Sequence, residues 1–152
     1  ILVFGGTNNY MLHLVQGIED PLSGFIKDDP VRPHIEIDKR FGPDKFVLAL
    51  VNEKVQALVC CKLSSIVPVS EQELFDDAEL PGDNAIFYTI WSYTQGAGRM
   101  LILEALDYIK KQYPDVKRFI TLSPTTEMAR RFHLKNGAKI LQVNETTVNY
   151  EY

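Results

Sequence analysis

A glycine-rich turn between an apolar segment and an amphipathic segment is the clearest chemical feature of this 152-residue sequence. In FYTIWSYTQGAGRMLILEAL, Gly96 and Gly98 let the backbone approach a ligand closely. The helix expected after them supplies unpaired N–H groups and a positive dipole end, and Arg99 adds a fixed positive charge. These features favour a pyrophosphate over residues 94–99, and a tight turn that binds nothing fits them equally well. The spacing is neither G-x-G-x-x-G nor a Walker loop, which disfavours the nucleotide-binding folds.

Ser123 and His133 are the next two residues whose types could do chemistry. Ser123 ends an apolar run, and His133 lies well along the helix expected after it. If strand and helix diverge, both side chains could line one cleft, where a hydroxyl and a histidine suit enolate stabilisation and proton donation. Each also has a structural explanation. Ser123 before Pro124 fits a helix N-cap, and His133 beside Phe132 fits a histidine at the edge of the core.

The elements that must position these residues follow from the pattern of apolar residues. Strands are predicted at Ile1–Phe4, Phe46–Val51, Val55–Ser64, Ala85–Ser92 and Phe119–Leu122, and a closing hairpin at Lys139–Val143 with Thr147–Tyr152. Helices are predicted from Asn9 to Gly17, from Ser70 to Asp77, from Gly98 to Pro114, and from about Pro124 to Lys135. Ala85–Ser92 carries no charge and is expected to be a central strand. The order predicts an α/β fold with a mixed sheet.

Composition excludes several classes of protein. With 16 Lys and Arg against 20 Asp and Glu, the net charge is −4, which argues against a nucleic-acid partner. The length and a hydrophobic fraction of 45% predict one domain over residues 1–152. No apolar run is long enough to cross a membrane. A homodimer is one assembly that the sequence leaves open.

The two cysteines indicate the compartment. Cys60 and Cys61 are neighbours in an apolar stretch, so on a strand their side chains point to opposite faces. That arrangement suits neither a disulfide nor a metal site, and no metal is expected. An interior strand in a reducing, cytoplasmic compartment is the prediction.

The order of elements and the glycine turn resemble the GNAT (N-acetyltransferase-like) family. In that family a turn with the pattern R/Q-x-x-G-x-G/A holds the pyrophosphate of coenzyme A. Gly96 and Gly98 match this pattern, and the R/Q position falls on Tyr93. The resemblance implies a single GNAT-like domain with a mixed, mostly antiparallel sheet flanked by helices. It also implies coenzyme A contacts from Tyr93, Thr94, Gln95, Gly96, Ala97, Gly98 and Arg99.

Five short segments narrow this resemblance. They are Asp38–Asp44, Phe87–Ile90, Leu122–Pro124, Phe132–Ala138 and Val148–Tyr152. In this order they resemble parts of the catalytic domain of malonyl-CoA decarboxylases, a GNAT-fold family. The resemblance covers about residues 31–152 and implies Ser123 and His133 as the catalytic pair. It implies an acyl-CoA, either malonyl-CoA or acetyl-CoA, as the small-molecule substrate.

Three functions follow as alternatives. The first is decarboxylation of a malonyl-type thioester to acetyl-CoA and CO2, which the serine and histidine favour. The second is transfer of an acetyl group from acetyl-CoA to an amine, although Ala85–Ser92 offers no carboxylate to deprotonate one. The third is a non-catalytic acyl-CoA-binding module, which the departure from the family pattern at Tyr93 favours.

Overall fold

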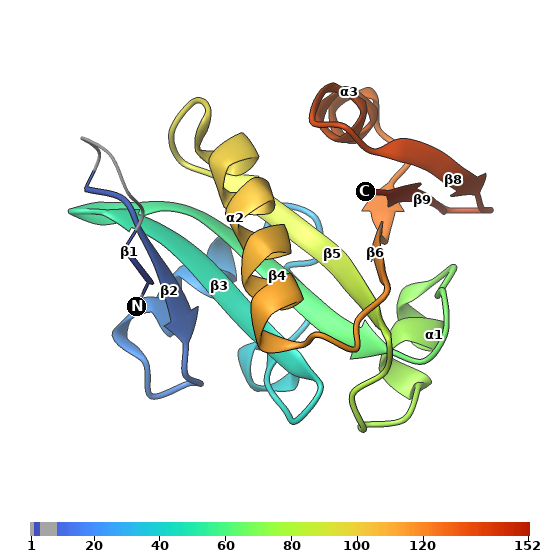
Figure 1. Cartoon of the computed structure of the whole chain (residues 1–152), viewed down its shortest axis with the longest axis horizontal. Helices are drawn as coiled ribbons and strands as arrows, with labels where there is room; N and C mark the ends of the chain where they lie inside the picture. The colour runs from blue at the N-terminus through green and yellow to red at the C-terminus, as the bar shows by residue number, and fades with distance from the viewer. Residues whose placement is uncertain (1, 4–8) are drawn as a thin grey trace.

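A nine-stranded sheet forms the frame of the protein in the computed structural model, which describes residues 2–3 and 9–152 (Figure 1). The strands are β1 Leu2–Val3, β2 Met11–Val15, β3 Lys45–Asn52, β4 Lys54–Ser64, β5 Asn84–Ser92, β6 Arg118–Thr121, β7 Ser123–Pro124, β8 Lys139–Val143 and β9 Thr147–Glu151. Their order is β1-β2-β3-β4-β5-β6-β9-β7, and β8 pairs with β9. The strands β5 and β6 pair in parallel, and the other pairs are antiparallel.

Helices cover both faces of this sheet. The long helix α2, Ala97–Gln112, lies across β3, β4 and β5 (Figure 1) and buries Leu101, Ile102 and Ile109 among their side chains. The other face is covered by the 3₁₀ segments η1, Pro21–Asp28, and η2, Ile37–Arg40, together with α1, Glu71–Asp76. The fold is therefore α/β, with a mixed, mostly antiparallel sheet flanked by helices, as predicted.

Local signals explain most of these boundaries. Glu53, with a φ of 64°, makes the turn between β3 and β4. Ser70 caps α1 by accepting a hydrogen bond from the Glu73 N–H at 3.1 Å, and Gly137, with a φ of 103°, follows the end of α3, Glu127–Lys135. The predicted central strand is confirmed, because β5 lies between β4 and β6 and is buried on both faces.

The helix predicted from Asn9 to Gly17 is wrong, because Met11–Val15 forms strand β2. Its full length pairs with β3, from Met11 opposite Val51 to Val15 opposite Val47. The apolar edge of β3 satisfies the backbone of this segment, and that tertiary pairing outweighs the local helix pattern. The strand predicted over Ile1–Phe4 is seen at Leu2–Val3, and Ile1 and Phe4 lie outside the described residues.

The start of the helix after Ser123 also differs from the prediction. The N-cap of α3 is Thr126, whose hydroxyl accepts a hydrogen bond from the Ala129 N–H at 3.2 Å. Ser123 and Pro124 instead form the short strand β7, paired with Val148 and Thr147 of β9. The N-cap interpretation of Ser123 is therefore wrong, because the Ser123 side chain does not cap α3.

Cys60 and Cys61 are both buried free thiols in β4, as predicted. Cys61 packs into the core beneath α2, and Cys60 packs into the core on the opposite face. Burial raises the pKa of the Cys60 thiol to about 11, so this thiol stays protonated near neutral pH. Both cysteines are thus part of the packed interior.

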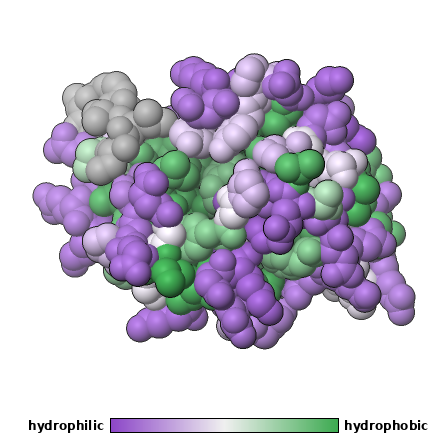
Figure 2. Space-filling view, turned by 90° about the horizontal axis from the view of Figure 1, so that it is seen from below, coloured by the Kyte–Doolittle hydropathy of each residue, from purple (hydrophilic) through white to green (hydrophobic). Residues whose placement is uncertain are grey.

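The surface is mostly hydrophilic on the face that Figure 2 shows, with smaller apolar areas between the polar side chains. Among the described helices, α2 is the longest at 16 residues. No helix in the described part of the chain combines the length and the apolar character that a bilayer-crossing segment needs.

Candidate functional site

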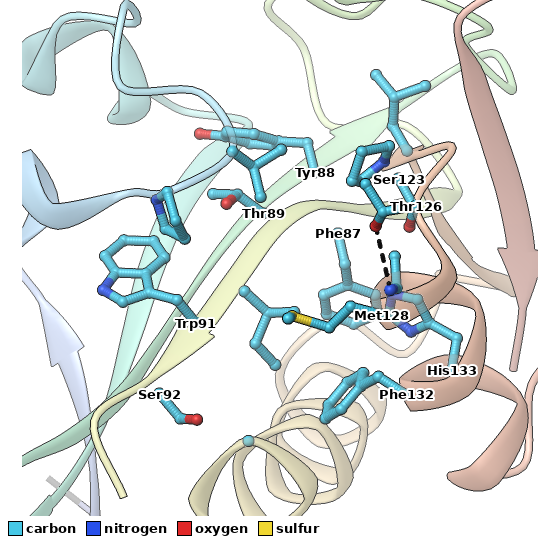
Figure 3. Close-up of a pocket in the computed structure, with 17 residues that line it drawn as sticks. Phe87, Tyr88, Thr89, Trp91, Ser92, Ser123, Thr126, Met128, Phe132 and His133 are labelled. Carbon is cyan, nitrogen blue, oxygen red and sulfur yellow. Dashed lines mark hydrogen bonds between the residues drawn. The ribbon is translucent and has the colours of Figure 1, made fainter.

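The divergence of two neighbouring strands opens a cavity in the described part of the molecule. β5 and β6 pair as far as Phe87 and Thr121, and the Leu122 N–H still donates to the Phe87 carbonyl at 2.9 Å. Beyond that point β5 continues to Ser92 paired only with β4, while the other strand turns toward β9. A cavity of about 590 Å³ opens where they separate (Figure 3). It is lined by Pro30, Val31, Phe87–Ser92, Gly98, Leu122, Ser123, Pro124, Thr126, Met128, Ala129, Phe132 and His133.

Ser123 and His133 both line this cavity, as Figure 3 shows. The structure therefore brings the two predicted catalytic residues to one place, each with only 4% of its surface exposed. The Ser123 hydroxyl donates to Thr121 Oγ1 at 2.8 Å, and Thr121 Oγ1 also accepts the Tyr150 N–H at 3.0 Å. The Ser123 oxygen keeps lone pairs that these contacts do not use.

The ring of His133 is held by aromatic side chains from β9 and the chain end. It stacks on Tyr150 with ring centroids 5.0 Å apart, and its Nδ1 lies 2.7 Å from the Tyr152 hydroxyl oxygen. Burial lowers the pKa of His133 to about 4, because the apolar surroundings disfavour the imidazolium ion. The histidine is therefore neutral at physiological pH, with one nitrogen fixed by a hydrogen bond.

The glycine turn lies at the same cavity. Gly96, with a φ of 84°, is the N-cap of α2 in a left-handed conformation that glycine adopts without strain. Gly98 lines the cavity, and a Cβ atom there would be 3.1 Å from the Phe132 ring, so glycine lets α3 approach α2. Within residues 9–152, no acceptor is bonded to the N–H groups of Gly98 and Arg99. These free donors at a helix N-terminus form an anion-binding geometry.

The remaining residues of the turn hold it in place. Residues 93–96 are exposed, and the Thr94 hydroxyl donates to Gln56 Oε1 at 2.5 Å. The Ala97 N–H donates to the Thr94 carbonyl at 3.2 Å, which closes the turn before α2. The exposed Arg99 guanidinium donates to Asn136 Oδ1 at 3.0 Å and so ties the start of α2 to the end of α3.

Tyr93 has contacts of its own. Its hydroxyl donates to Asp28 Oδ2 at 2.7 Å and accepts a hydrogen bond from Trp91 Nε1 at 3.2 Å. Partial desolvation of the exposed side chain, together with the bond to Asp28, raises the pKa of Tyr93 to about 12. The Tyr93 side chain thus connects the turn to η1.

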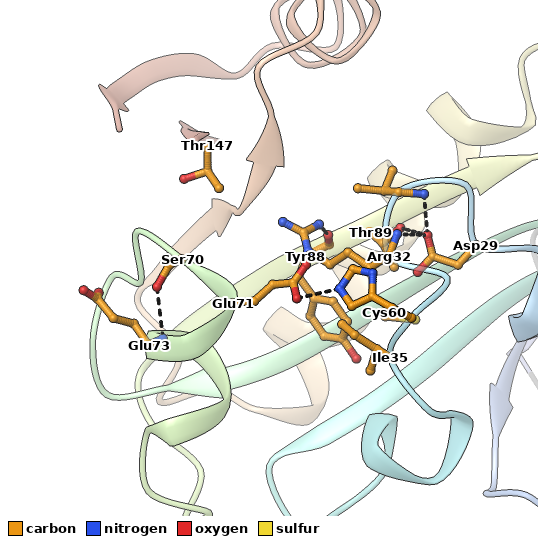
Figure 4. Close-up of polar contacts among 12 residues, drawn as sticks. Asp29, Arg32, Ile35, Cys60, Ser70, Glu71, Glu73, Tyr88, Thr89 and Thr147 are labelled. Carbon is orange, nitrogen blue, oxygen red and sulfur yellow. Dashed lines mark hydrogen bonds and ion pairs between the residues drawn. The ribbon is translucent and has the colours of Figure 1, made fainter. Parts of the chain in front are cut away.

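Three features of the site could not be predicted from the residues alone. Tyr152 contacts His133, yet its segment stands out in the sequence only for its resemblance to the decarboxylases. Thr121 binds Ser123, and the only signal for it is its position two residues earlier on the same apolar run. A buried group of charged side chains around Asp29 contacts β5 behind the cavity wall (Figure 4), in a proline-broken region without a clear pattern.

The chemistry available in the cavity is that of neutral hydrogen-bonding groups in mainly apolar surroundings. Its described lining contains no Asp, Glu, Lys or Arg. Within the described residues, no group of three His, Cys, Asp or Glu side chains could hold a metal ion. Hydroxyl groups, a neutral imidazole and backbone N–H groups can stabilise negative charge that develops on an oxygen atom.

Solved structures with similar folds include malonyl-CoA decarboxylases and N-acetyltransferases. A malonyl-CoA decarboxylase from Agrobacterium vitis superposes with a TM-score of 0.78 at 18% identity, over 94% of this chain and 60% of that one. The N-acetyltransferase PseH from Campylobacter jejuni superposes with a TM-score of 0.65 at 10% identity, over 94% of this chain and 96% of that one. PaiA N-acetyltransferase from Thermoplasma acidophilum, in complex with coenzyme A, gives a TM-score of 0.52 at 17% identity, over 71% and 60%.

These likenesses establish the fold. It is GNAT-like and resembles the malonyl-CoA decarboxylase domain, as the sequence predicted. The chain spans about 60% of the length of the decarboxylase chains that it matches. No family model matches the chain, and no curated protein matches it.

Proposed function

We propose that this chain is an acyl-CoA enzyme that decarboxylates a malonyl-type thioester to acetyl-CoA and CO2, with residues 1–152 as one acyl-CoA-binding domain. One observation carries the proposal. Ser123 and a neutral His133 line the same cavity, and no carboxylate in its described lining could act as a base toward an amine. The folds of the similar decarboxylases support it.

In this proposal, Ser123 and His133 act on the thioester oxygen. When the bond between the α-carbon and the carboxylate breaks, its electron pair forms an enolate and CO2 leaves. A Tyr152 hydroxyl that donates to His133 Nδ1 leaves the ring proton on Nε2, which then donates to the enolate oxygen. Rotation of the Ser123 hydroxyl away from Thr121 supplies a second donor. The α-carbon then takes up one proton from water that enters the open cavity.

The apolar lining assists the same step. A carboxylate loses hydration when it enters surroundings such as Phe87, Ile90 and Leu122, and its charge spreads onto the enolate as CO2 departs. The turn at residues 93–99 is proposed to hold the coenzyme A pyrophosphate on the free N–H groups of Gly98 and Arg99. No metal is proposed, and the substrate is a small molecule in a cytoplasmic setting.

The experiment that tests this proposal omits any amine. Malonyl-CoA is incubated with the protein while acetyl-CoA, CO2 and free thiol are measured side by side. We expect one acetyl-CoA per CO2 and no free thiol. Ser123→Ala and His133→Ala should each lower the rate by 10²–10³, or about 2–4 kcal/mol, and the double variant should lose much less than the sum of the two. Lys111→Met, at an exposed lysine on α2, serves as the control.

An N-acyltransferase is the second candidate, supported by the fold that PseH shares over 94% of this chain. In this case acetyl-CoA would release free thiol only when an amine is supplied. His133→Tyr would then retain much of the activity, because tyrosine is an alternative acid for a departing thiolate. If the protein is a decarboxylase, the same variant should lose most of its decarboxylation activity. Thiol release without CO2 would replace the first proposal with the second.

A non-catalytic acyl-CoA-binding module is the third candidate, and the engagement of Tyr93 with Asp28 favours it. Binding of acyl-CoA with no product from either assay would select it. A homodimer stays a proposal that sedimentation of the purified protein would test.

A further inference from the structure

A buried ionic network lies behind the part of the cavity wall formed by β5 (Figure 4). Its three central side chains are almost fully enclosed: Asp29 is 2% exposed, Arg32 is 3% and Arg40 is 1%. Arg40 Nη1 lies 2.6 Å from Asp29 Oδ2, and its Nη2 donates to the Arg32 carbonyl at 2.7 Å. Charges buried this deeply are costly to place, so their arrangement restricts the backbone around them.

Asp29 organises the loop that carries it. Its Oδ1 accepts the N–H groups of Val31 at 2.8 Å and Arg32 at 2.9 Å, which folds residues 29–32 into a fixed turn. Burial opposes the charge on Asp29, but the hydrogen bonds from Arg32, Arg40 and Thr89 outweigh it and hold the pKa of this carboxyl below its ordinary value. The two residues inside this turn, Pro30 and Val31, line the cavity.

The same turn is hydrogen-bonded to two consecutive residues of β5. The Thr89 hydroxyl donates to Asp29 Oδ1 at 2.8 Å, and Arg32 Nη1 donates to the Tyr88 carbonyl. β5 is irregular here, because Cys60 of β4 is opposite Thr89 and Cys61 is opposite Phe87, so Tyr88 is an extra residue. Such a bulge leaves a residue outside the regular ladder, and an external partner for its carbonyl fixes the bulge in one conformation.

The geometry of Arg32 suits this task better than that of a lysine. While Nη1 contacts the Tyr88 carbonyl, Nε lies 2.8 Å from Glu71 Oε1. One planar guanidinium thus contacts β5 on one side and α1 on the other. A lysine has a single nitrogen at the end of a flexible chain and cannot span both contacts with a fixed orientation.

We infer that Arg32 is a positioning residue, which sets the shape of the cavity beside Tyr88 and Thr89 by holding the Tyr88 bulge of β5 against the turn at residues 29–32. The inference rests on the proposed function for its effect on rate. Tyr88 and Thr89 form one side of the cavity, and Pro30 and Val31 form another. If Arg32 is lost, these two sides separate, although Ser123, His133 and the glycine turn keep their own contacts.

Trp91 makes the inference testable without turnover. It is the single tryptophan of the chain, lies three residues after Tyr88 on β5, and lines the cavity with 8% of its surface exposed. Its fluorescence and its quenching by acrylamide therefore report on this wall. Arg32→Lys and Arg32→Met are compared with Lys111→Met, which removes an exposed cation paired with Asp107 on α2.

We expect the quenching constant of Trp91 to rise at least twofold in both Arg32 variants and to stay unchanged in Lys111→Met. In the decarboxylation assay, kcat should fall roughly tenfold to hundredfold, and KM should change by less than about threefold. Thr89→Val and Thr89→Ser provide a second pair that is expected to fold. Valine should reproduce the rise in quenching, and serine, which keeps the hydroxyl toward Asp29, should restore the wild-type value.

Unchanged Trp91 quenching in the Arg32 and Thr89 variants would overturn the inference, whatever their activity. A lower melting temperature with unchanged kcat would also overturn it, because that pattern describes support of the fold alone. If the wild-type protein forms no acetyl-CoA, the proposed function fails, and the quenching comparison still decides whether Arg32 positions the wall.

Discussion

His133 Nδ1 lies 2.7 Å from the hydroxyl oxygen of Tyr152, so this ring nitrogen has a defined partner that is outside the cavity lining. Burial raises the pKa of Tyr152 above its ordinary value, which keeps the phenol protonated and able to donate. The orientation of the histidine is thus set by a residue that does not line the cavity.

Tyr152→Phe should therefore affect activity more than stability. The variant keeps the aromatic ring and removes only the hydroxyl, so we expect a loss of about 1 kcal/mol in unfolding free energy. The loss of histidine orientation should lower kcat about tenfold or more. Tyr108→Phe is the matched control, because among the described residues the Tyr108 hydroxyl has no hydrogen-bond partner. Equal kcat values for the two variants would remove Tyr152 from the site.

The stability of the protein should fall between pH 6.5 and 4 because of His133. Its pKa is about 4 in the folded protein, against 6.5 for an unperturbed histidine, so the unfolded chain binds a proton that the folded one excludes. The contribution of the neutral ring is fully present above pH 6.5 and is lost as the pH falls toward 4. At pH 5 we expect the loss to be about 2 kcal/mol. Urea unfolding at pH 7 and pH 5 measures it.

His133→Asn should remove most of this pH dependence, and Lys111→Met, at an exposed lysine on α2, should not. The same low pKa implies that kcat for decarboxylation is nearly flat between about pH 5.5 and 8, because His133 does not titrate in that range. A kinetic pKa near 6.5 that disappears in His133→Asn would contradict the burial that the structure shows.

Much of the fold could be predicted because its local signals agree with its tertiary contacts. The apolar run at β5, the β3–β4 hairpin and the amphipathic α2 each bury the residues that their patterns place inward. The prediction for Met11–Val15 is wrong because its apolar residues fit either a helix or a strand, and only the edge of β3 decides between them. The η1 and η2 segments lie among prolines, where no periodic pattern exists.

The candidate site was partly predictable for a similar reason. Ser123 and His133 belong to short motifs whose resemblance to the decarboxylases points to them, and the divergence of β5 and β6 explains why they share a cavity. The contact of Tyr152 with His133 and the contacts of Asp29 and Arg32 with β5 could not be predicted, because each joins residues that are distant in sequence. Thr89, for example, is 60 positions from Asp29. Contacts of this kind depend on how the sheet is assembled.

Gly82→Ala should destabilise the fold strongly. A Cβ atom at this position would overlap the backbone carbon and oxygen of Ser64, so the turn before β5 must move away from the end of β4. We expect a loss of about 2–4 kcal/mol in unfolding free energy, measured in urea. Gly24→Ala is the control, because a Cβ there meets nothing within 4 Å, and its effect should stay within about 0.5 kcal/mol. Similar midpoints for both variants would disprove the close packing at Gly82.

Coenzyme A should raise the melting temperature, and the two glycines of the turn should be needed for that rise. At a concentration 100 times Kd, binding adds about 2.7 kcal/mol to the unfolding free energy, which raises the melting temperature by on the order of 5–10 °C for a chain of this size.

In Gly98→Val the added Cβ would lie 3.1 Å from the Phe132 ring, and the larger side chain would cover the free N–H groups, so the shift should vanish. Gly96→Ala places alanine at a φ of 84°, which costs about 1–2 kcal/mol and should weaken the shift as well as lower the starting temperature. Gly24→Ala should keep the full shift, since Gly24 lies in η1, outside the turn.

Thermal unfolding with coenzyme A, acetyl-CoA and malonyl-CoA at millimolar concentration measures these shifts. If none of the three moves the transition of the wild-type protein, the acyl-CoA proposals fail together, because each of them requires this turn to bind the pyrophosphate.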